Sequence, residues 1–202
     1  MIAIIDYGVG NLYSLEASFR KIGATTVVTS DRDVILSADR IILPGVGAFG
    51  DASDKLRSSG LDKVIYEAVE LGKPLMGICL GMQLLFEYGE EFGRHSGLGL
   101  LKGGVVSMKG VIPDDYKLPQ IGWNALDIKR SVPLFKHLNN GDFVYFVHSF
   151  YVTDCEDSLV ATTEYGAEIT AAVCNGNVMG CQFHPEKSGD VGLNILRGFT
   201  EL

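Results

Sequence analysis

The apolar positions of the first half form short continuous runs that alternate with stretches of helical periodicity. The strand-like runs are "IAIID", "TTVVTS", "RIILPG" and "KPLMGI", and the helix-like stretches are "LYSLEASFRKIG", residues 61–71 and "LGMQLLFEYG". Strands that are apolar at successive positions are typical of parallel strands buried on both faces. The alternation of strands and helices therefore predicts a doubly wound α/β layer.

The second half is richer in strand-like runs. These runs are "GGVVSM", "DFVYFVHSFYV", "SLVATT" and "TAAVCNGNVMGCQF". Within the last of them, Asn175-Gly176 predicts a two-residue hairpin. We expect these strands to be antiparallel and to extend the same sheet. Proline and glycine at 110–124 predict a loop, and "SGDVGLNILRGFTEL" predicts a closing helix.

Composition narrows the class of protein without identifying a ligand. The chain has 202 residues, 47% of them hydrophobic and 21% charged, which predicts one globular domain over residues 1–202. No basic leader precedes the first apolar run and no stretch reaches the ~20 apolar residues of a membrane span, so we expect a cytoplasmic protein. A net charge of −8 disfavours a nucleic-acid partner.

Two kinds of bound group are also disfavoured. The four cysteines include no CxxC pair, so neither a zinc site nor a disulfide framework is expected. The segment "GVGNLY" lacks the third glycine of a dinucleotide-binding fingerprint. We therefore expect no metal and no cofactor.

The thiol of Cys79 lies where a predicted strand meets a predicted helix. In "GICLG" a glycine stands two residues to either side, which is the spacing of a nucleophile elbow. Gly77 and Gly81 carry no Cβ, so a sharp turn costs little steric strain. The N-terminal end of a helix beginning at Leu80 would stabilise a thiolate. A buried structural cysteine is the alternative, but the elbow context favours a nucleophile.

A thiolate needs a general base, and this chain offers four histidines. His184 stands in "CQFHPEKS" at the end of a predicted strand, with Glu186 two residues on. Residues i and i+2 of an extended segment point the same way, so Glu186 could orient the imidazole. A surface glutamate after a His-Pro turn is the alternative. His95 and His137 lie in polar contexts and are expected in solvent, whereas His148 is expected in the core.

Acyl chemistry also needs hydrogen-bond donors for an oxyanion. The segment "LPGVGAFG" follows the apolar run "RIIL". Gly45, Val46 and Gly47 could present backbone N–H groups beside that of Leu80, and one such donor is worth roughly 3 kcal/mol of transition-state stabilisation. A plain glycine turn is the alternative. From the residues alone, the chemistry is that of a cysteine hydrolase or acyl-transfer enzyme without an identified substrate.

Several motifs together resemble a known family. "PGVGAFG", "GICLGMQLLFE" and "GCQFHPEKS" resemble class I glutamine amidotransferases. "DYGVGN", "PQIGWN", "YFVHSFY" and "HPEKS" resemble, more narrowly, the glutaminase subunits of imidazole glycerol phosphate synthases of histidine biosynthesis. The resemblance spans essentially the whole chain. It implies a three-layer, flavodoxin-like fold with a mostly parallel central sheet and an antiparallel extension.

The resemblance also implies roles for individual residues. Cys79, His184 and Glu186 would form the catalytic triad, with the oxyanion held by Leu80 and by residues 45–47. The expected glutamine-binding residues are Gln83, Glu91, His148, Ser149 and Phe150. Two positions vary within the wider family: Met82 stands where many members have histidine, and Phe150 where many have tyrosine.

A protein partner is implied as well. In this family the ammonia passes to a (β/α)8-barrel cyclase, which forms imidazole glycerol phosphate and an aminoimidazole carboxamide ribonucleotide. The residues expected to face this cyclase or to gate ammonia are Asn11, Trp123, Tyr145 and Lys187. Three rival interpretations stay open: a glutaminase subunit of another synthase, a non-catalytic regulatory subunit, and a cysteine peptidase. "DYGVGN", Met82 and "PQIGWN" disfavour the first, and the complete triad disfavours the second.

Overall fold

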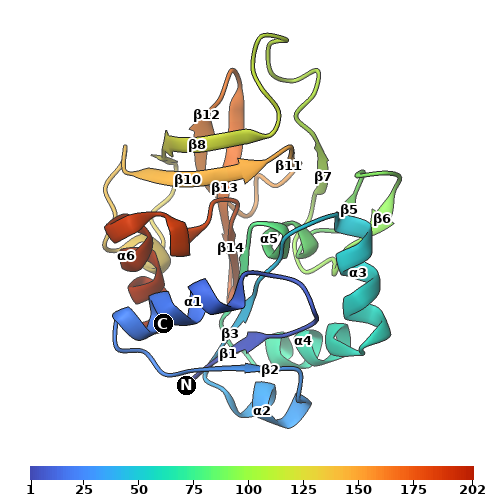
Figure 1. Cartoon of the computed structure of the whole chain (residues 1–202), viewed down its shortest axis with the longest axis vertical. Coiled ribbons are helices and arrows are strands. Elements are labelled where there is room, and N and C mark those ends of the chain that lie inside the picture. The colour runs from blue at the N-terminus through green and yellow to red at the C-terminus, as the bar shows by residue number, and fades with distance from the viewer.

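Strands and helices alternate through the first half of the computed structural model, which describes residues 1–202 (Figure 1). The helices are α1 (Leu12–Lys21), α2 (Arg32–Ser37), α3 (Phe49–Ser58), α4 (Leu61–Glu70), α5 (Leu80–Leu84) and α6 (Gly189–Thr200), with 3-10 turns η1 (Pro133–Phe135) and η2 (Pro185–Lys187). The strands are β1 (Ile2–Ile5), β2 (Thr26–Thr29), β3 (Arg40–Leu43), β4 (Leu75–Ile78), β5 (Tyr88–Gly89), β6 (His95–Ser96), β7 (Gly104–Ser107), β8 (Gln120–Ala125), β9 (Asp127–Ile128), β10 (Phe143–His148), β11 (Phe150–Thr153), β12 (Leu159–Glu164), β13 (Glu168–Asn175) and β14 (Val178–Cys181).

The central sheet confirms the predicted doubly wound architecture. Its strand order is β2-β1-β3-β4-β14-β13-β12-β9, and the first five strands are parallel. This is the 2-1-3-4-5 order of flavodoxin-like sheets, in which ligands bind beyond the carboxyl ends of the strands. β13, β12 and β9 continue the sheet in antiparallel pairings, so the antiparallel extension is confirmed as well.

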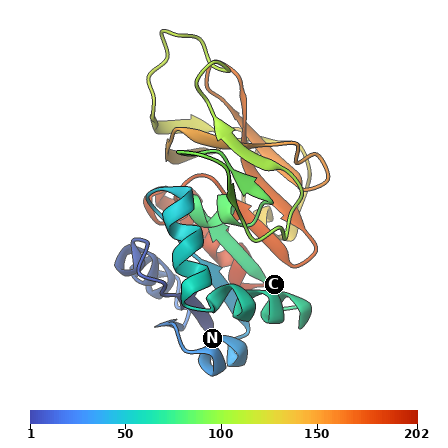
Figure 2. The same ribbon diagram turned by 90° about the vertical axis from the view of Figure 1, so that its right-hand side faces the viewer.

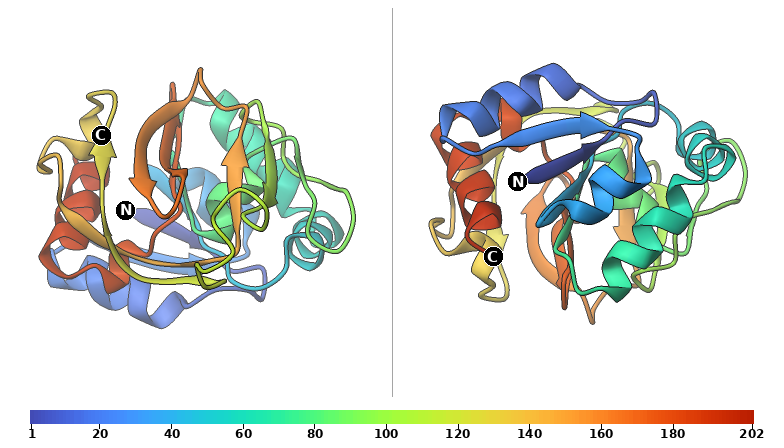
Figure 3. Two further views of the ribbon diagram at one scale, coloured as in Figure 1. Left: turned by 90° about the horizontal axis from the view of Figure 1, so that it is seen from above. Right: turned by 90° about the horizontal axis from the view of Figure 1, so that it is seen from below.

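Two helical layers cover the sheet and explain its continuous apolar strands. In β1, Ile2 and Ile4 pack in the same core cluster as helices α1 and α6, whereas Ala3 and Ile5 pack with helices α2 to α5. Figure 3 shows α1 and α6 on one side of β1 and the other helices opposite. Since successive side chains of a strand point to opposite faces, every position of a doubly covered strand must be apolar.

Part of the predicted extension belongs to other sheets. The run "DFVYFVHSFYV" divides at Ser149: β10 pairs with β8 in a two-stranded sheet, while β11 joins β7, β5 and β6 in a four-stranded sheet. Buried and accessible positions alternate along β10, so only one of its faces packs on the core. Figure 2 shows these strands gathered at the end of the molecule away from both termini. The prediction that they extend the main sheet is therefore wrong.

Three boundaries also differ from the predictions. The helix from Leu80 ends at Leu84, because carbonyls of Leu84, Leu85 and Phe86 accept hydrogen bonds from residues 98–101 and not from a further helical turn. The predicted loop at 110–124 ends in strand β8. The hairpin is confirmed, but Asn175 pairs with Val178, so its two loop residues are Gly176 and Asn177.

No helix of the structure combines the length and the apolar character that crossing a membrane would require.

Candidate active site

Cys79 occupies a strained turn between β4 and α5. Its backbone has φ 54° and ψ −112°, a conformation that L-residues rarely adopt. The flanking glycines are required by close packing, because a Cβ on Gly81 would lie 1.9 Å from the Leu43 carbonyl oxygen and one on Gly77 would lie 2.6 Å from the backbone of Gly81. The sequence-based prediction of an elbow is matched by this geometry.

His184 and Glu186 form a buried pair at the end of β14. His184 Nδ1 lies 2.8 Å from Glu186 Oε1, and the two side chains are only 3% and 4% exposed. The pair is formed by the 3-10 turn η2 and not by an extended segment, so the expected adjacency is present but its predicted backbone geometry is wrong. The backbone N–H of His184 donates to the carbonyl oxygen of Tyr145 in β10 at 2.9 Å.

The second nitrogen of His184 faces the thiol side of the site. Nε2 is buried and makes no hydrogen bond in this state. Burial lowers the pKa of His184, but the neighbouring Cys79 and the Glu186 carboxylate together outweigh burial and raise that pKa to about 9. Catalytic hydrogen bonds are often long or poorly aligned before substrate binds. At neutral pH the imidazole is therefore protonated, with Glu186 holding one nitrogen and the other facing the thiol.

The Glu186→Gln substitution is expected to lower the pKa of His184 by at least about one unit, because it removes the negative charge that favours the imidazolium. The side-chain ¹⁵N resonances of His184, followed against pH, measure this value. In the folded chain the pKa of His184 lies above its ordinary value of 6.5. Protonated His184 and its carboxylate partner therefore stabilise the fold fully below pH 6.5, and this stabilisation is lost as the pH rises through about 9. The matched control is Glu201→Gln, because Glu201 pairs with the exposed His137. An unchanged His184 titration in Glu186→Gln would contradict the prediction.

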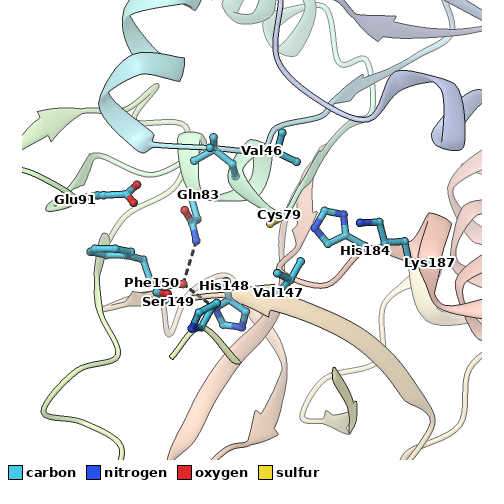
Figure 4. Close-up of a pocket in the computed structure, with 13 residues that line it drawn as sticks. Val46, Cys79, Gln83, Glu91, Val147, His148, Ser149, Phe150, His184 and Lys187 are labelled. Carbon is cyan, nitrogen blue, oxygen red and sulfur yellow. Dashed lines mark hydrogen bonds between the residues drawn. The ribbon is translucent and has the colours of Figure 1, made fainter. Parts of the chain in front are cut away.

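One cavity brings most of the predicted residues together. It has a volume of about 350 Å³, within the range of small-molecule sites. The predicted residues that line it are Val46, Gly47, Cys79, Leu80, Gln83, Glu91, His148, Ser149, Phe150, His184 and Lys187. Figure 4 shows Glu91 and Phe150 on one side of Cys79, and His184 and Lys187 on the other. Pro119 and Val147 also line the cavity and were missed by the sequence analysis.

The predicted glutamine-binding side chains are fixed by backbone contacts. Gln83 Nε2 donates to the Phe150 carbonyl oxygen at 3.1 Å, and His148 Nδ1 lies 2.8 Å from the same oxygen. Burial lowers the pKa of His148 to about 4, so this histidine is neutral and its Nδ1–H is the donor. Glu91 Oε2 accepts a hydrogen bond from the Phe49 N–H at 2.9 Å, where α3 begins.

The glycine-containing segment 45–47 passes directly beside the thiol turn. A Cβ on Gly45 would lie 2.8 Å from both the backbone nitrogen of Gly81 and the hydroxyl oxygen of Tyr7. Tyr7 is buried and donates to the Pro44 carbonyl oxygen at 2.7 Å, so it anchors the start of the segment. Gly47 has φ 98°. The segment packs against the turn and lines the cavity with Val46 and Gly47, and Tyr7 is a further residue that the sequence analysis missed.

Three of the four predicted partner-facing residues cluster beside the cavity. The rings of Trp123 and Tyr145 meet edge to face with centroids 6.0 Å apart, and Lys187 Nζ lies 5.9 Å from the centroid of the Tyr145 ring. Trp123 is 52% exposed. Asn11 caps helix α1, where its side chain accepts a hydrogen bond from the Ser14 N–H.

Comparison with known proteins identifies the family. The class I glutamine amidotransferase model matches residues 3–201. The HisH subunit of imidazole glycerol phosphate synthase from Syntrophotalea carbinolica is 49% identical, with 100% of both chains covered. The HisH subunit from Bacillus cereus strain ATCC 14579 is 52% identical, covering 98% of this chain and 93% of that one.

Solved structures confirm the fold class. A glutamine amidotransferase structure has a TM-score of 0.77 at 17% identity, covering 100% of this chain and 98% of that one. A PurLQS structure from Thermotoga maritima has a TM-score of 0.76 at 23% identity, covering 99% and 97%. Identities this low show the fold alone, whereas the sequence relatives at about half identity show the family. The chain therefore belongs to the class I glutamine amidotransferases and, within them, to the glutaminase subunits of imidazole glycerol phosphate synthase.

Proposed function

We propose that Cys79, His184 and Glu186 hydrolyse L-glutamine to glutamate and ammonia, and that the ammonia serves a cyclase partner in histidine biosynthesis. The observation that carries the proposal is the placement of a strained, positive-φ cysteine in one cavity with a histidine whose other nitrogen is held by a buried carboxylate. The proposal takes residues 1–202 as one catalytic domain acting in the cytoplasm.

In this mechanism the Cys79 sulfur attacks the side-chain carbonyl carbon of glutamine. The N–H of Leu80 and those of segment 45–47 receive the oxyanion. The tetrahedral species collapses to a γ-glutamyl thioester as the C–N bond breaks, and protonated His184 donates its proton to the departing ammonia. His184 then takes a proton from water, whose oxygen attacks the thioester and releases glutamate and the free thiol. Glu186 keeps the imidazole oriented throughout.

The surroundings of the cavity support an amino-acid substrate. The Glu91 carboxylate lies at the end of the cavity away from His184 and could pair with the α-ammonium group of glutamine (Figure 4). The backbone of His148, Ser149 and Phe150 forms the adjacent wall and could bind its α-carboxylate and α-amino groups. Gln83 would contact the side chain near the reacting amide.

The partner is proposed to be the (β/α)8-barrel cyclase subunit, in a one-to-one heterodimer. The cluster of the exposed Trp123, the half-buried Tyr145 and Lys187 beside the cavity supports docking at this face, since tryptophan and tyrosine are enriched in interface cores. A partner seated there would cover the cavity and could receive ammonia without its release to solvent. Asn11 is proposed as an outer contact of the same docking face.

Glutamate release tests the proposed function. It is measured with this chain alone, with the cyclase subunit, and with the cyclase subunit plus the nucleotide ligand of the cyclase. A large rise in the rate of glutamate release is expected only in the third condition, because the cyclase consumes ammonia only when its nucleotide ligand is bound. Equal rates in all three would keep the glutaminase chemistry but reject this partner. Absence of release in all three, from folded proteins, would favour a non-catalytic regulatory subunit.

Lys187→Ala is expected to weaken cyclase binding by up to about fivefold, because it removes an exposed cation from the proposed docking face and an exposed ion pair with a partner is worth up to about 1 kcal/mol. Calorimetric titration with the cyclase subunit measures the affinity, and the ratio of glutamate to cyclase product measures coupling. Lys63→Ala is the matched control, since Lys63 is an exposed lysine on α4 outside this cluster. Wild-type affinity together with wild-type coupling would reduce Lys187 to a surface charge.

A further inference from the structure

Gln182 links the reactive sulfur to the substrate-binding side of the cavity. This residue is 0% exposed and directly follows β14. Its Nε2 lies 3.7 Å from Cys79 Sγ, and its Oε1 accepts a hydrogen bond from Gln83 Nε2 at 2.9 Å. Gln83 Nε2 also donates to the Phe150 carbonyl oxygen at 3.1 Å. A continuous chain of hydrogen bonds therefore joins β11 to the thiol.

The chemistry of this chain determines which atom of Gln182 faces the sulfur. A backbone carbonyl only accepts hydrogen bonds, so the atom of Gln83 beside the Phe150 oxygen must be its nitrogen. The atom of Gln182 that contacts this nitrogen must then be its oxygen. The other end of the Gln182 amide is consequently an N–H donor, and it points at Cys79 Sγ. A flipped amide would place two donors against each other at Gln83.

We propose that Gln182 is a positioning residue that donates a hydrogen bond to the sulfur of Cys79, stabilising its thiolate and fixing its direction in the cavity. The proposal rests on Cys79 being the nucleophile of the proposed function. It assigns to Gln182 a role that neither the elbow motif nor the triad supplies.

Gln182 acts on the thiolate together with His184, whose pKa is raised to about 9 by the neighbouring Cys79 and by Glu186. Helix α5 has only five residues, so the dipole that the sequence analysis assigned to it is short. Gln182 Nε2 is a second donor at Cys79 Sγ, 3.7 Å away. A donor to a charged acceptor contributes more than one between neutral groups, and a buried donor without a partner is costly, so Gln182 favours the ionised sulfur.

The same chain also prepares Gln83 for its substrate. Both hydrogens of Gln83 Nε2 are used, one by Gln182 and one by Phe150, so its Oε1 is the atom left to contact a ligand. Figure 4 shows this oxygen turned away from Phe150 and toward the side of the cavity where Glu91 lies. Since Gln83 lines the cavity, it offers an acceptor to the side-chain NH2 of glutamine. The same hydrogen-bond network thus orients the Cys79 sulfur and the Gln83 oxygen that would accept a hydrogen bond from the substrate amide.

The test uses Gln182→Met, which keeps the length of the side chain and removes its donor and acceptor. Cys79 is alkylated with iodoacetamide across a pH series, and its modification is followed by mass spectrometry of the peptide that contains it. The alkylation midpoint is expected to rise by about one pH unit, which lowers the rate at pH 7 about tenfold. The matched control is Gln120→Met, because Gln120 is equally buried but donates to Asn124 and not to Cys79.

The outcomes are distinct. A Gln182→Met midpoint equal to that of the wild type or of Gln120→Met would overturn the proposal. Alkylation does not depend on glutamine turnover, so loss of the proposed function, seen as glutamate release that persists in Cys79→Ala, would be recognised separately. If Gln182→Met does not fold, the side-chain amide resonance of Gln182 in the wild-type chain is followed against pH. The Gln182 resonance should shift at the pH at which Cys79 is half-alkylated in the wild type, and it should not shift in Cys79→Ala. A Gln182 resonance that does not change with pH in the wild type would overturn the proposal.

Discussion

Cys79→Ala is expected to abolish synthesis from glutamine while leaving synthesis from added ammonia. The substitution removes the sulfur that would form the thioester, and no other thiol lines the cavity. Loss of the nucleophile of a triad lowers turnover by at least about 10⁴-fold. Ammonia supplied in solution bypasses the glutaminase step, so the cyclase of the complex should still form its product. Product formation from glutamine and from ammonium salt, assayed side by side in the reconstituted complex, measures both effects.

Cys174→Ala is the matched control for this prediction. Cys174 is a partly exposed cysteine of β13 that does not line the cavity, and burial raises the pKa of its thiol. It should retain both activities. Loss of both activities in Cys79→Ala would mean that Cys79 also supports assembly or the cyclase, whereas retention of glutamine-dependent synthesis would remove Cys79 from the mechanism.

Gly81→Ala is expected to destabilise the fold by more than about 4 kcal/mol, the range reserved for severe steric conflicts. A Cβ at this position would lie 1.9 Å from the carbonyl oxygen of Leu43 and 3.2 Å from the backbone of Pro44. These are backbone atoms of β3 and of the loop that follows it, so no side-chain rotation relieves the overlap. Because domains of this kind are stable by only about 5–15 kcal/mol, at least about a quarter of this stability would be lost. Urea unfolding followed by circular dichroism measures the change.

Gly23→Ala separates steric overlap from the general effect of adding a methyl group to a glycine. Gly23 has φ 78° and no atom within 4 Å of a built Cβ, so its substitution costs only backbone strain of about 1–2 kcal/mol. A Gly81→Ala chain no less stable than Gly23→Ala would show that β3 and α5 can separate at little cost. In that case the close contact would not be what holds the elbow in place.

The sequence predicts the layer order well because that order depends on simple periodicity. Continuous apolar strands and intervening amphipathic helices suffice to predict the first four parallel strands, and the glycines around Cys79 predict a tight turn at one of their ends. The fifth, β14, was expected among the antiparallel strands and is instead parallel to β4. His184 and Glu186 are predicted by their spacing alone, since any local turn or strand keeps residues two apart within reach of each other. These features depend on neighbours in the chain.

The missed features depend on contacts between distant segments. Helix α5 ends at Leu84 because backbone N–H groups of residues 98–101 donate hydrogen bonds to the carbonyls of residues 84–86. The sequence around Leu84 does not predict these contacts. Helix α2 was also missed, although Asp31 accepts hydrogen bonds from two N–H groups at its start and is a recognisable cap. Gln182 and Tyr7 lie within the quoted motifs "GCQFHPEKS" and "DYGVGN", but those motifs do not predict their roles, which arise from partners 103 and 37 residues away.

The hydrogen bond from the His184 N–H to the Tyr145 carbonyl has a mechanical consequence. Cys79 is fixed to the central sheet, where its N–H bonds the carbonyl of Cys181, whereas the backbone of His184 is also tied to the two-stranded sheet that carries Trp123. The distance between the Cys79 sulfur and the His184 imidazole therefore depends on how the two-stranded β8–β10 sheet sits relative to the central sheet. A displacement of the outer sheet would therefore act on the backbone of His184, and not on the strand that carries Cys79.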